Sequence, residues 1–271
     1  SQSTLADAVL VDRAATYLSI PAYQTAGELY TFLVGHRKGH EDRPTILHNL
    51  LVCDIQRSDW DAASGTASLF FDEFPEHELL PDVARMYSDA LYAKGDYVGC
   101  LAIATDKRTA FPAGSEERRS LDFNVAVSLY QQGKFAEAEA EFDVFAETYT
   151  EGRRTGQAAF YRGATKVELK NWDAGSAILD EFCEKVPNLN TLRPAGLYLA
   201  SLCYLQSDLL DEALVRATEI IEKYPDSPQV AVAQNIRGDV LIGIGEAPIP
   251  EVITCFEDGK AAAERFGDEP A

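Results

Sequence analysis

The stretch from Leu121 to Thr150 carries two apolar stripes that meet at a glycine. Leu121, Val125 and Leu129 recur every four positions, which is the pattern of one face of an α-helix. Gly133 interrupts the pattern, because glycine is a poor helix former and a good left-handed stop. A second stripe follows at Phe135, Ala138, Phe142, Phe145 and Tyr149. The stretch therefore predicts a helical hairpin that cannot bury both stripes alone.

The hairpin pattern recurs along the whole chain. A large residue follows each predicted turn, at Tyr23, Trp60, Tyr97, Phe135, Trp172 and Leu210, and successive members differ in position by 37, 37, 38, 37 and 38. The hairpin ends recur in the same register, at Phe74-Pro75, Phe111-Pro112, Tyr149-Thr150, Val186-Pro187 and Tyr224-Pro225. A small residue stands three positions after each large one, at Ala26, Ala63, Cys100, Ala138, Gly175 and Ala213. Three coincident registers predict a helical solenoid.

The registers set the expected domain and its repeats. We expect one all-α solenoid domain over residues 1–271, rather than two globular domains. We expect hairpin turns at Ser58, Gly95, Gly133 and Asn171, and a longer turn after Gly245. Seven repeats are expected at approximately 4–38, 44–75, 80–112, 115–150, 155–187, 192–225 and 228–267.

The net charge of the chain limits the classes of partner that it can bind. The chain of 271 residues has 44 acidic and 24 basic side chains, a net charge of −20. This charge disfavours nucleic acid, which requires a basic surface, and no apolar run reaches the ~18 residues of a membrane span. We therefore expect neither nucleic acid binding nor membrane insertion. The excess of acidic side chains would suit a basic protein partner. It is equally consistent with a solvated outer face or with adaptation to a high-salt environment.

Five cysteines, at positions 53, 100, 183, 203 and 255, form no CxxC pair. All five fall on helical stripes, where cysteine behaves as a small buried apolar residue. Cys183 and Cys203 fall on neighbouring helices, so a disulfide between them stays open at this point.

The sequence lacks a catalytic constellation. It contains no P-loop, no GxSxG and no paired CxxC motif. His36 and His40 have a spacing that metal sites use, but Gly39 and the charged loop argue against a rigid helix that presents both. We expect no enzymatic activity, no metal and no cofactor.

The hairpins resemble the tetratricopeptide repeat family. In the opening stretch the resemblance rests on Ala126, Gly133, Phe135, Ala138 and Phe142. The segment Tyr224-Pro225-Asp226-Ser227-Pro228 resembles the family's terminal proline motif. The family's usual period is about 34 residues. The longer period here resembles repeats of bacterial envelope proteins, such as outer-membrane assembly lipoproteins and the periplasmic partner of the Tol–Pal system. The first repeat departs most, since its turn has no glycine and its end has no proline.

The resemblance implies a right-handed αα superhelix whose first helices line a concave, peptide-binding groove. His48 and Val52 fall on this predicted face, and the groove candidates are Arg85, Asp89, Tyr92, Phe123, Asn124, Val127, Tyr130, Phe160, Ala164, Val167, Tyr198, Leu202 and Leu205. Only Arg85 is basic here, so the lysine- and arginine-rich clamp that some family members use for a terminal carboxylate is missing.

Three groove candidates form what we call the aromatic ladder: Phe123, Phe160 and Tyr198, at equivalent positions of successive repeats. If the ladder binds a partner segment, its side chains should be partly exposed on one surface. Alternatively, these aromatics fill space between adjacent first helices. Both readings stay open in the sequence.

The sequence favours a non-catalytic scaffold that binds a protein or peptide segment in its groove. Two alternatives remain: an assembly subunit that uses its outer face or the solenoid ends, and a recruiting domain of a larger protein. The resemblance favours the bacterial periplasm or an outer-membrane lipoprotein, with the cytoplasm as the other option. The oligomeric state and the partner are left undetermined.

Overall fold

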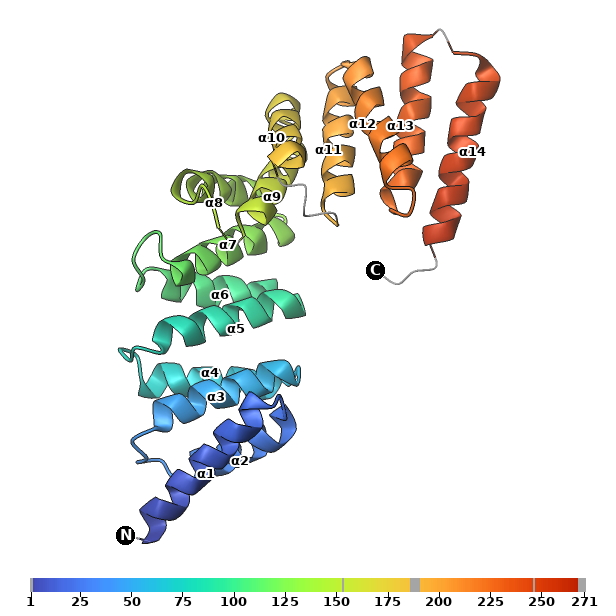
Figure 1. The fold of residues 1–271 in the computed structure, drawn as a ribbon. Coiled ribbons are helices and arrows are strands. Elements are labelled where there is room, and N and C mark those ends of the chain that lie inside the picture. The colour runs from blue at the N-terminus through green and yellow to red at the C-terminus, as the bar shows by residue number, and fades with distance from the viewer. Residues whose placement is uncertain (1, 153, 186–190, 246, 268–271) are drawn as a thin grey trace. The chain divides into compact units, whose positions relative to one another are not determined.

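The structure is a computed structural model that describes residues 2–152, 154–185, 191–245 and 247–267. The described residues form fourteen α-helices in seven successive hairpins (Figure 1). The first four hairpins are α1 Gln2–Ser19 with α2 Tyr23–His36, α3 Arg43–Gln56 with α4 Trp60–Glu73, α5 Leu80–Lys94 with α6 Tyr97–Arg108, and α7 Glu116–Gln131 with α8 Phe135–Thr148. The last three are α9 Thr155–Glu168 with α10 Trp172–Lys185, α11 Arg193–Gln206 with α12 Leu210–Lys223, and α13 Gln229–Ile244 with α14 Ile249–Phe266.

These helices confirm the predicted hairpins. The apolar pattern predicts helices over residues 80–94 and 229–244, and α5 and α13 begin and end at these residues. The pattern also predicts a helix over residues 96–111, and the difference is largest there, because α6 ends at Arg108. The predicted hairpin end at Val186-Pro187 lies outside the described residues. The fold is an all-α, tetratricopeptide-like solenoid in which neighbouring hairpins pack on one another.

The chain divides into two compact parts, residues 1–128 and residues 129–271, and the division falls inside α7. The first part contains α1 to α6 with most of α7, and the second contains the end of α7 with α8 to α14. Among the described helices, none combines the length and the apolar character that crossing a membrane requires.

A left-handed residue ends the first helix of most hairpins. From the second hairpin onwards, positive φ angles of 56° to 80° recur at this place in the repeat register, at Ser58, Gly95, Gly133, Lys170, Asp208 and Gly245. After each of the first five of these residues, the next backbone N–H bonds to the carbonyl five positions earlier, the Schellman arrangement, as in Asp96 to Leu91 at 2.9 Å and Lys134 to Leu129 at 3.0 Å. The turns at Ser58, Gly95 and Gly133 are confirmed. The fifth turn is one position earlier than predicted, because Lys170 rather than Asn171 takes the left-handed conformation.

Each part has two different faces. First helices of consecutive hairpins contact one another, as in α1 with α3, α3 with α5, α9 with α11 and α11 with α13. Within the described part of either unit, the backbones of the second helices of consecutive hairpins do not approach one another in this way, and only side chains reach across. The first helices therefore form a continuous layer, which we call the first-helix face, whereas grooves separate the second helices.

Three arginines tie successive hairpins together every second repeat. Arg43, Arg118 and Arg193 stand two repeats apart, each at the start of a first helix. The Nη1 group of each donates to a carbonyl near the end of the preceding second helix: Val34 at 2.9 Å, Arg108 at 2.6 Å, and Cys183. Because helix C-termini leave carbonyls without intrahelical donors, a guanidinium there satisfies them.

Each of these guanidiniums also meets a carboxylate. Arg43 binds Glu73 through Nε and Nη2 at 2.5 and 2.9 Å, and Arg193 binds Glu219 at 3.0 Å. In these two cases the carboxylate lies on the second helix of the arginine's own hairpin, so one side chain joins three helices. This device was not predicted, although its signal, an arginine that recurs every second repeat, is visible in the sequence.

All five cysteines are buried and unpaired. Cys183 lies beside Gly196 of α11, and Cys203 beside Gly175 of α10, so each sulfur fills the space that a glycine leaves. Burial raises the pKa of both thiols to about 12. In the structure these two cysteines are therefore packing residues, and no disulfide joins them.

Candidate functional site

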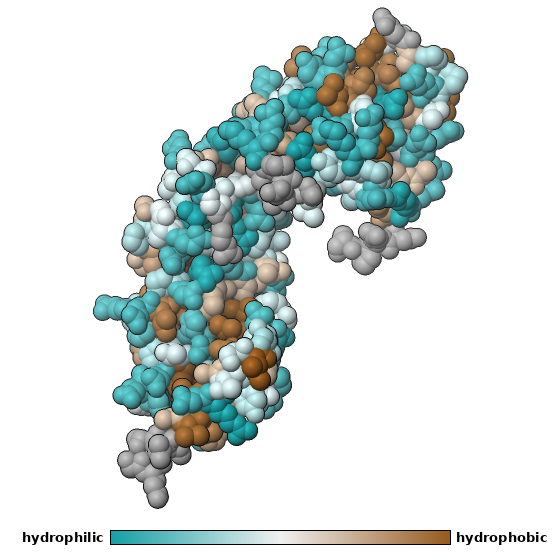
Figure 2. Space-filling view, in the orientation of Figure 1, coloured by the Kyte–Doolittle hydropathy of each residue, from teal (hydrophilic) through white to brown (hydrophobic). Residues whose placement is uncertain are grey.

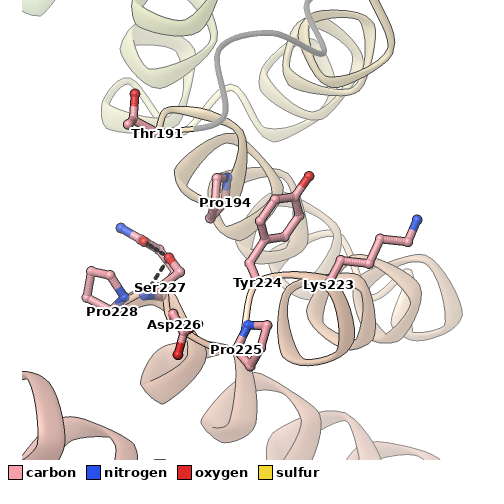
Figure 3. Close-up of a pocket in the computed structure, with 9 residues that line it drawn as sticks. Thr191, Pro194, Lys223, Tyr224, Pro225, Asp226, Ser227 and Pro228 are labelled. Atoms are coloured by element: carbon pink, nitrogen blue, oxygen red, sulfur yellow. Dashed lines mark hydrogen bonds between the residues drawn. The ribbon is translucent and has the colours of Figure 1, made fainter.

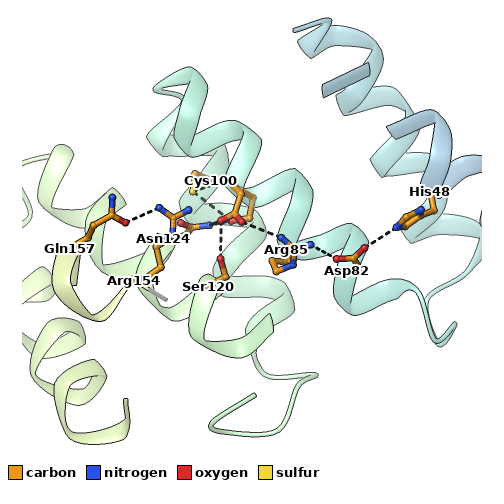
Figure 4. Close-up of polar contacts among 10 residues, drawn as sticks. His48, Asp82, Arg85, Cys100, Ser120, Asn124, Arg154 and Gln157 are labelled. Atoms are coloured by element: carbon orange, nitrogen blue, oxygen red, sulfur yellow. Dashed lines mark hydrogen bonds and ion pairs between the residues drawn. The ribbon is translucent and has the colours of Figure 1, made fainter. Parts of the chain in front are cut away.

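In the first part, the first-helix face carries a chain of polar side chains across α3, α5 and α7 (Figure 4). Nε2 of His48 lies 2.8 Å from Oδ2 of Asp82, whose other oxygen bonds to Arg85. Arg85 reaches Asp89 one turn later, at 3.5 Å. Oδ1 of Asp89 accepts from Oγ of Ser120 and from Nδ2 of Asn124, both at 2.9 Å.

In this network, the polar groove candidates Arg85, Asp89 and Asn124 bind to one another. Arg85 and Asp89 are half-buried, and Asn124 is fully buried between Asp89 and Ser88. A carboxylate holds the guanidinium of Arg85 on each side. The polar candidates of this part therefore bind neighbouring first helices to one another.

Asp82 changes the acid–base behaviour of His48. The hydrogen bond that His48 donates to the carboxylate of Asp82 raises the pKa of His48, while burial opposes the rise. In return, the His48 hydrogen bond and Arg85 lower the pKa of Asp82 to about 2, against an opposing effect of burial. The pair is therefore an ion pair across the gap between α3 and α5 in mildly acidic solution.

We expect the His48–Asp82 pair to make stability depend on pH. A raised histidine pKa contributes stability below about pH 6.5, the value in unfolded chains, and this contribution is lost as pH rises through the folded pKa. The lowered pKa of Asp82 contributes above about pH 4 and is lost as pH falls towards about 2. The groups that face His48 are Asn49 on its own helix and Asp82 and Arg85 on α5.

An NMR titration of the His48 ring tests this expectation. The wild-type pKa should lie above about 6.5 and should fall in the Asp82→Asn variant, because the acceptor carboxylate is gone. His48→Gln should flatten the loss of thermal stability between about pH 6.5 and 8. The same His48 pKa in the wild type and in Asp82→Asn would contradict the structure.

The aromatic ladder is buried, so the expectation of an exposed ladder is wrong for two of its three members. Phe123 is 0% and Phe160 is 9% exposed, and only Tyr198 is half-buried. Phe123 packs edge-on against Tyr92 of α5, with ring centroids 5.9 Å apart. Phe160 packs against Phe182 of α10 at 5.7 Å. The alternative interpretation, that these aromatics fill space between adjacent first helices, fits Phe123, whereas Phe160 packs against the second helix of its own hairpin.

The other groove candidates divide by exposure. Val127 on α7 and Ala164 and Val167 on α9 are buried. Half-buried candidates are Arg85, Asp89, Tyr92, Tyr130, Tyr198, Leu202 and Leu205. Tyr130 lies against Phe135 and Tyr161, with centroids 5.5 and 5.3 Å away, and burial raises its pKa to about 12. Apart from Tyr130, the partly accessible candidates of the second part are therefore on α11.

Tyr198, Leu202 and Leu205 make one stripe on α11. Their spacing of four and three positions places them on the same side of the helix. They cover the core cluster of the second part from the first-helix face and remain partly accessible. Leu202 and Leu205 carry no polar atom in their side chains, so this stripe contrasts with the polar chain of the first part.

A groove opens between the second helices α8 and α10, above α9, with a volume of about 580 Å³. Its apolar lining includes Phe142, Phe145, Tyr149, Ile178 and Phe182. Charged side chains at its edge are Glu151, Arg162, Glu181 and Lys185.

The next groove along the chain, between α10 and α12, is bridged. Asp180 of α10 accepts from Nε and Nη2 of Arg216 of α12 at 3.0 and 2.7 Å, and from Tyr204 of α11 at 2.6 Å. Ile178 occupies the position equivalent to Arg216 in the preceding repeat. An isoleucine cannot pair with Asp143, the equivalent of Asp180, and Asp143 instead binds Arg162 and Lys166 of α9. The α8–α10 groove is thus left open.

A smaller pocket of about 480 Å³ lies where α11, α12 and α13 approach one another at their loop ends. Figure 3 shows the ring of Tyr224 beside Pro194, while the Lys223 side chain extends away from it. The hydroxyl of Ser227 turns back to Gln229 at 2.5 Å. The pocket is lined mostly by residues of the α12–α13 turn, whose contacts hold the turn in place, so we do not treat it as a ligand site.

The two histidines with metal-site spacing, His36 and His40, have other partners in the structure. Within the ranges that the structure describes, no three histidine, cysteine, aspartate or glutamate side chains are placed to hold a metal ion. His36 bonds to the carbonyl of Phe32 at 2.9 Å, and His40 accepts from the backbone of Asp42 at 3.1 Å. Each of these histidines therefore stabilises its own loop or helix end.

Comparison with known proteins agrees with the repeats. The family model described as tetratricopeptide repeat matches residues 195–227. The solved C-terminal part of a tetratricopeptide repeat-containing protein from Cytophaga hutchinsonii is 14% identical, covers 94% of this chain and 95% of its own, and superimposes with a TM-score of 0.69. A tetratricopeptide repeat protein from Parabacteroides merdae is 12% identical over 97% of this chain and 94% of its own, with a TM-score of 0.63.

A third similar structure is MamA from residue 41 to its end, from Desulfovibrio magneticus. It is 14% identical, covers 70% of this chain and 97% of its own, and has a TM-score of 0.53. Among curated proteins, none matches the sequence. Identities of this size show a common fold, so the chemistry of a site must come from this chain's own residues.

Proposed function

We propose that this tetratricopeptide repeat protein is a non-catalytic scaffold that binds a protein or peptide segment on its first-helix face. Repeats of this kind generally bind proteins or peptides and are typically not catalytic. The observation that carries the proposal is the α11 stripe of Tyr198, Leu202 and Leu205, which is largely apolar and partly accessible. Apolar side chains on one accessible helix face suit the anchors of a bound segment.

The alternative of binding through the outer face has its own specific support. The α8–α10 groove is lined by aromatic side chains and lacks the ion pair that bridges the α10–α12 groove. An Ile178→Arg variant places an arginine opposite Asp143, in imitation of the Arg216–Asp180 pair, and should close the groove. This single substitution separates the two binding modes without altering the first-helix face.

The test is quantitative capture of partners from the native organism's lysate by the immobilised chain, followed by mass spectrometry. A specific partner should be weakened by Tyr198→Ala and by Leu202→Ser, by roughly 1–3 kcal/mol for a hot spot. Val98→Asp, at an exposed position of α6, is the matched control. Thermal melts check that each variant is folded. Loss of the partner in Ile178→Arg alone would favour the outer groove, and loss in neither would overturn both binding sites.

We place this scaffold, as part of the proposal, in a bacterial envelope complex, in the periplasm or at the outer membrane. The support for this setting is the long repeat, which exceeds the family's usual period and resembles that of envelope repeat proteins. Cell fractionation of the native protein tests it, and recovery in the cytoplasmic fraction would contradict it.

A further inference from the structure

The last hairpin leaves one side of α14 uncovered. Ile249 is 74% exposed and Ile253 is 49% exposed, one turn apart on the same side of the helix. Ile242, near the end of α13, is 59% exposed. Figure 2 shows apolar surface gathered beside the tip of the α13–α14 hairpin. We call Ile242, Ile249 and Ile253 the end face.

In the preceding hairpin, the next first helix covers the corresponding residues. Leu210 and Leu214 of α12 are the counterparts of Ile249 and Ile253, once the longer turn of the last hairpin is allowed for. Both leucines are half-buried against a core that α13 completes through Ala233, Ile236 and Val240.

The contact between α12 and α13 shows what kind of helix fits. A Cβ on Gly243 of α13 would lie 2.9 Å from a methyl group of Leu210, so α13 comes close to Leu210 at this position. By the repeat register, a helix stacked on Ile249 would approach it in the same way. The end face is therefore shaped for an α-helix that packs on it as α13 packs on α12.

The charges around the end face select a basic helix. Asp239 lies one turn from Ile242 and Glu257 one turn from Ile253, and both are exposed. The exposed Lys260 lies within 3.9 Å of Glu264. The whole chain carries a net charge of −20. A second copy of the chain and an anionic lipid surface both carry the same sign of charge, so electrostatics disfavours them as occupants.

We propose that the end face binds an amphipathic α-helix of a partner protein, with an apolar stripe and with lysine or arginine along its flanks. The helix stacks on α14 as an added first helix. This inference rests on the proposed scaffold function and names a second binding surface for it.

Synthetic helices of about 18 residues, five turns, test the proposal by fluorescence anisotropy. One peptide has a leucine and alanine stripe flanked by lysines, a second has glutamates in place of the lysines, and a third has the stripe scrambled. The lysine peptide should bind the wild-type chain, and the other two should bind at least about tenfold more weakly. Added salt should slow its association.

Variants locate the binding. Ile249→Asp and Ile253→Asp should each weaken the lysine peptide at least about tenfold, while Val98→Asp, at a residue that is 69% exposed on α6, should leave binding unchanged. All three positions are exposed, so unchanged melting temperatures are expected and confirm folding. No binding of the lysine peptide, or equal binding by Ile253→Asp, overturns the proposal.

Two further measurements distinguish a partner helix from the other possible occupants of the end face, a second copy of the chain and an anionic lipid surface. Sedimentation should show that the wild type and Ile253→Asp have the same mass, since a dimer that dissolves on Ile253→Asp would make a second copy the occupant. Flotation with anionic vesicles should leave the chain unbound, and bound chain would overturn the proposal. If Leu202→Ser abolishes partner capture while Ile253→Asp does not affect the lysine peptide, the end face fails and the scaffold function stands.

Discussion

Replacing Phe160 by alanine is expected to lower the free energy of unfolding by about 3–5 kcal/mol, as much as replacing Phe142. Phe142 is fully buried and stacks on Tyr161 at 6.2 Å, and Phe160 is 9% exposed and packs against Phe182 at 5.7 Å. Truncating either ring removes buried apolar surface and leaves a cavity at a helix crossing. Both residues therefore belong to the core of the second part.

Chemical denaturation of the two variants tests this equality. Tyr198→Ala is the internal comparison, because Tyr198 is at the same repeat position as Phe160 and is only half-buried. It should lose clearly less stability than Phe160→Ala. A Phe160→Ala variant as stable as the wild type would mean that its side chain faces solvent, and would restore the aromatic ladder as a binding surface.

The fold could be predicted because its signals are local and repeat. A large residue after each turn recurs in every one of the first six repeats, and the left-handed turn residues follow the same register from Ser58 onwards. The left-handed conformation of Gly133 can be predicted from its residue type, since glycine readily adopts positive φ. Residue type gives no such indication at Lys170 and Asp208, and their turns can be predicted only from the repeat register.

The site was harder to predict because the register identifies equivalent positions but not their surroundings. Phe123, Phe160 and Tyr198 are equivalent by spacing, yet one packs across to α5, one into its own hairpin, and one remains partly exposed. Exposure depends on the size of the neighbours across each helix crossing. Arg85 and Asp89 illustrate the same point, because their partners come from α5 and α7 together and leave little of either side chain to a ligand.

The bridges between second helices also follow from pairs that a repeat register does not reveal. Arg216 bridges two repeats only because Asp180 stands at the facing position. In the preceding repeat the aspartate is present at Asp143, but the arginine is replaced by Ile178. A groove thus arises from one substitution in an otherwise repeated arrangement, which is why the sequence pattern alone did not indicate it.

Replacing Gly163 by valine is expected to destabilise the chain by about 3 kcal/mol through overpacking. Gly163 of α9 is buried, and a Cβ there would lie 2.6 Å from Cγ and 2.8 Å from Cδ2 of Leu179 on α10. Leu179 is 0% exposed and has no room to move aside. In an exposed helix the same change would cost little, because valine and glycine are both modest helix formers.

Thermal unfolding of Gly163→Val, Leu179→Ala and the double variant measures the crossing directly. Leu179→Ala alone should cost about 2–5 kcal/mol through its cavity. In the double variant the added methyl groups occupy part of that cavity, so its loss should be smaller than the sum of the two single losses, by about 1–3 kcal/mol. Gly65, which has open space around it in α4, provides the matched control, and Gly65→Val should change stability little. Additive losses in the double variant would show that α9 and α10 do not cross at Gly163.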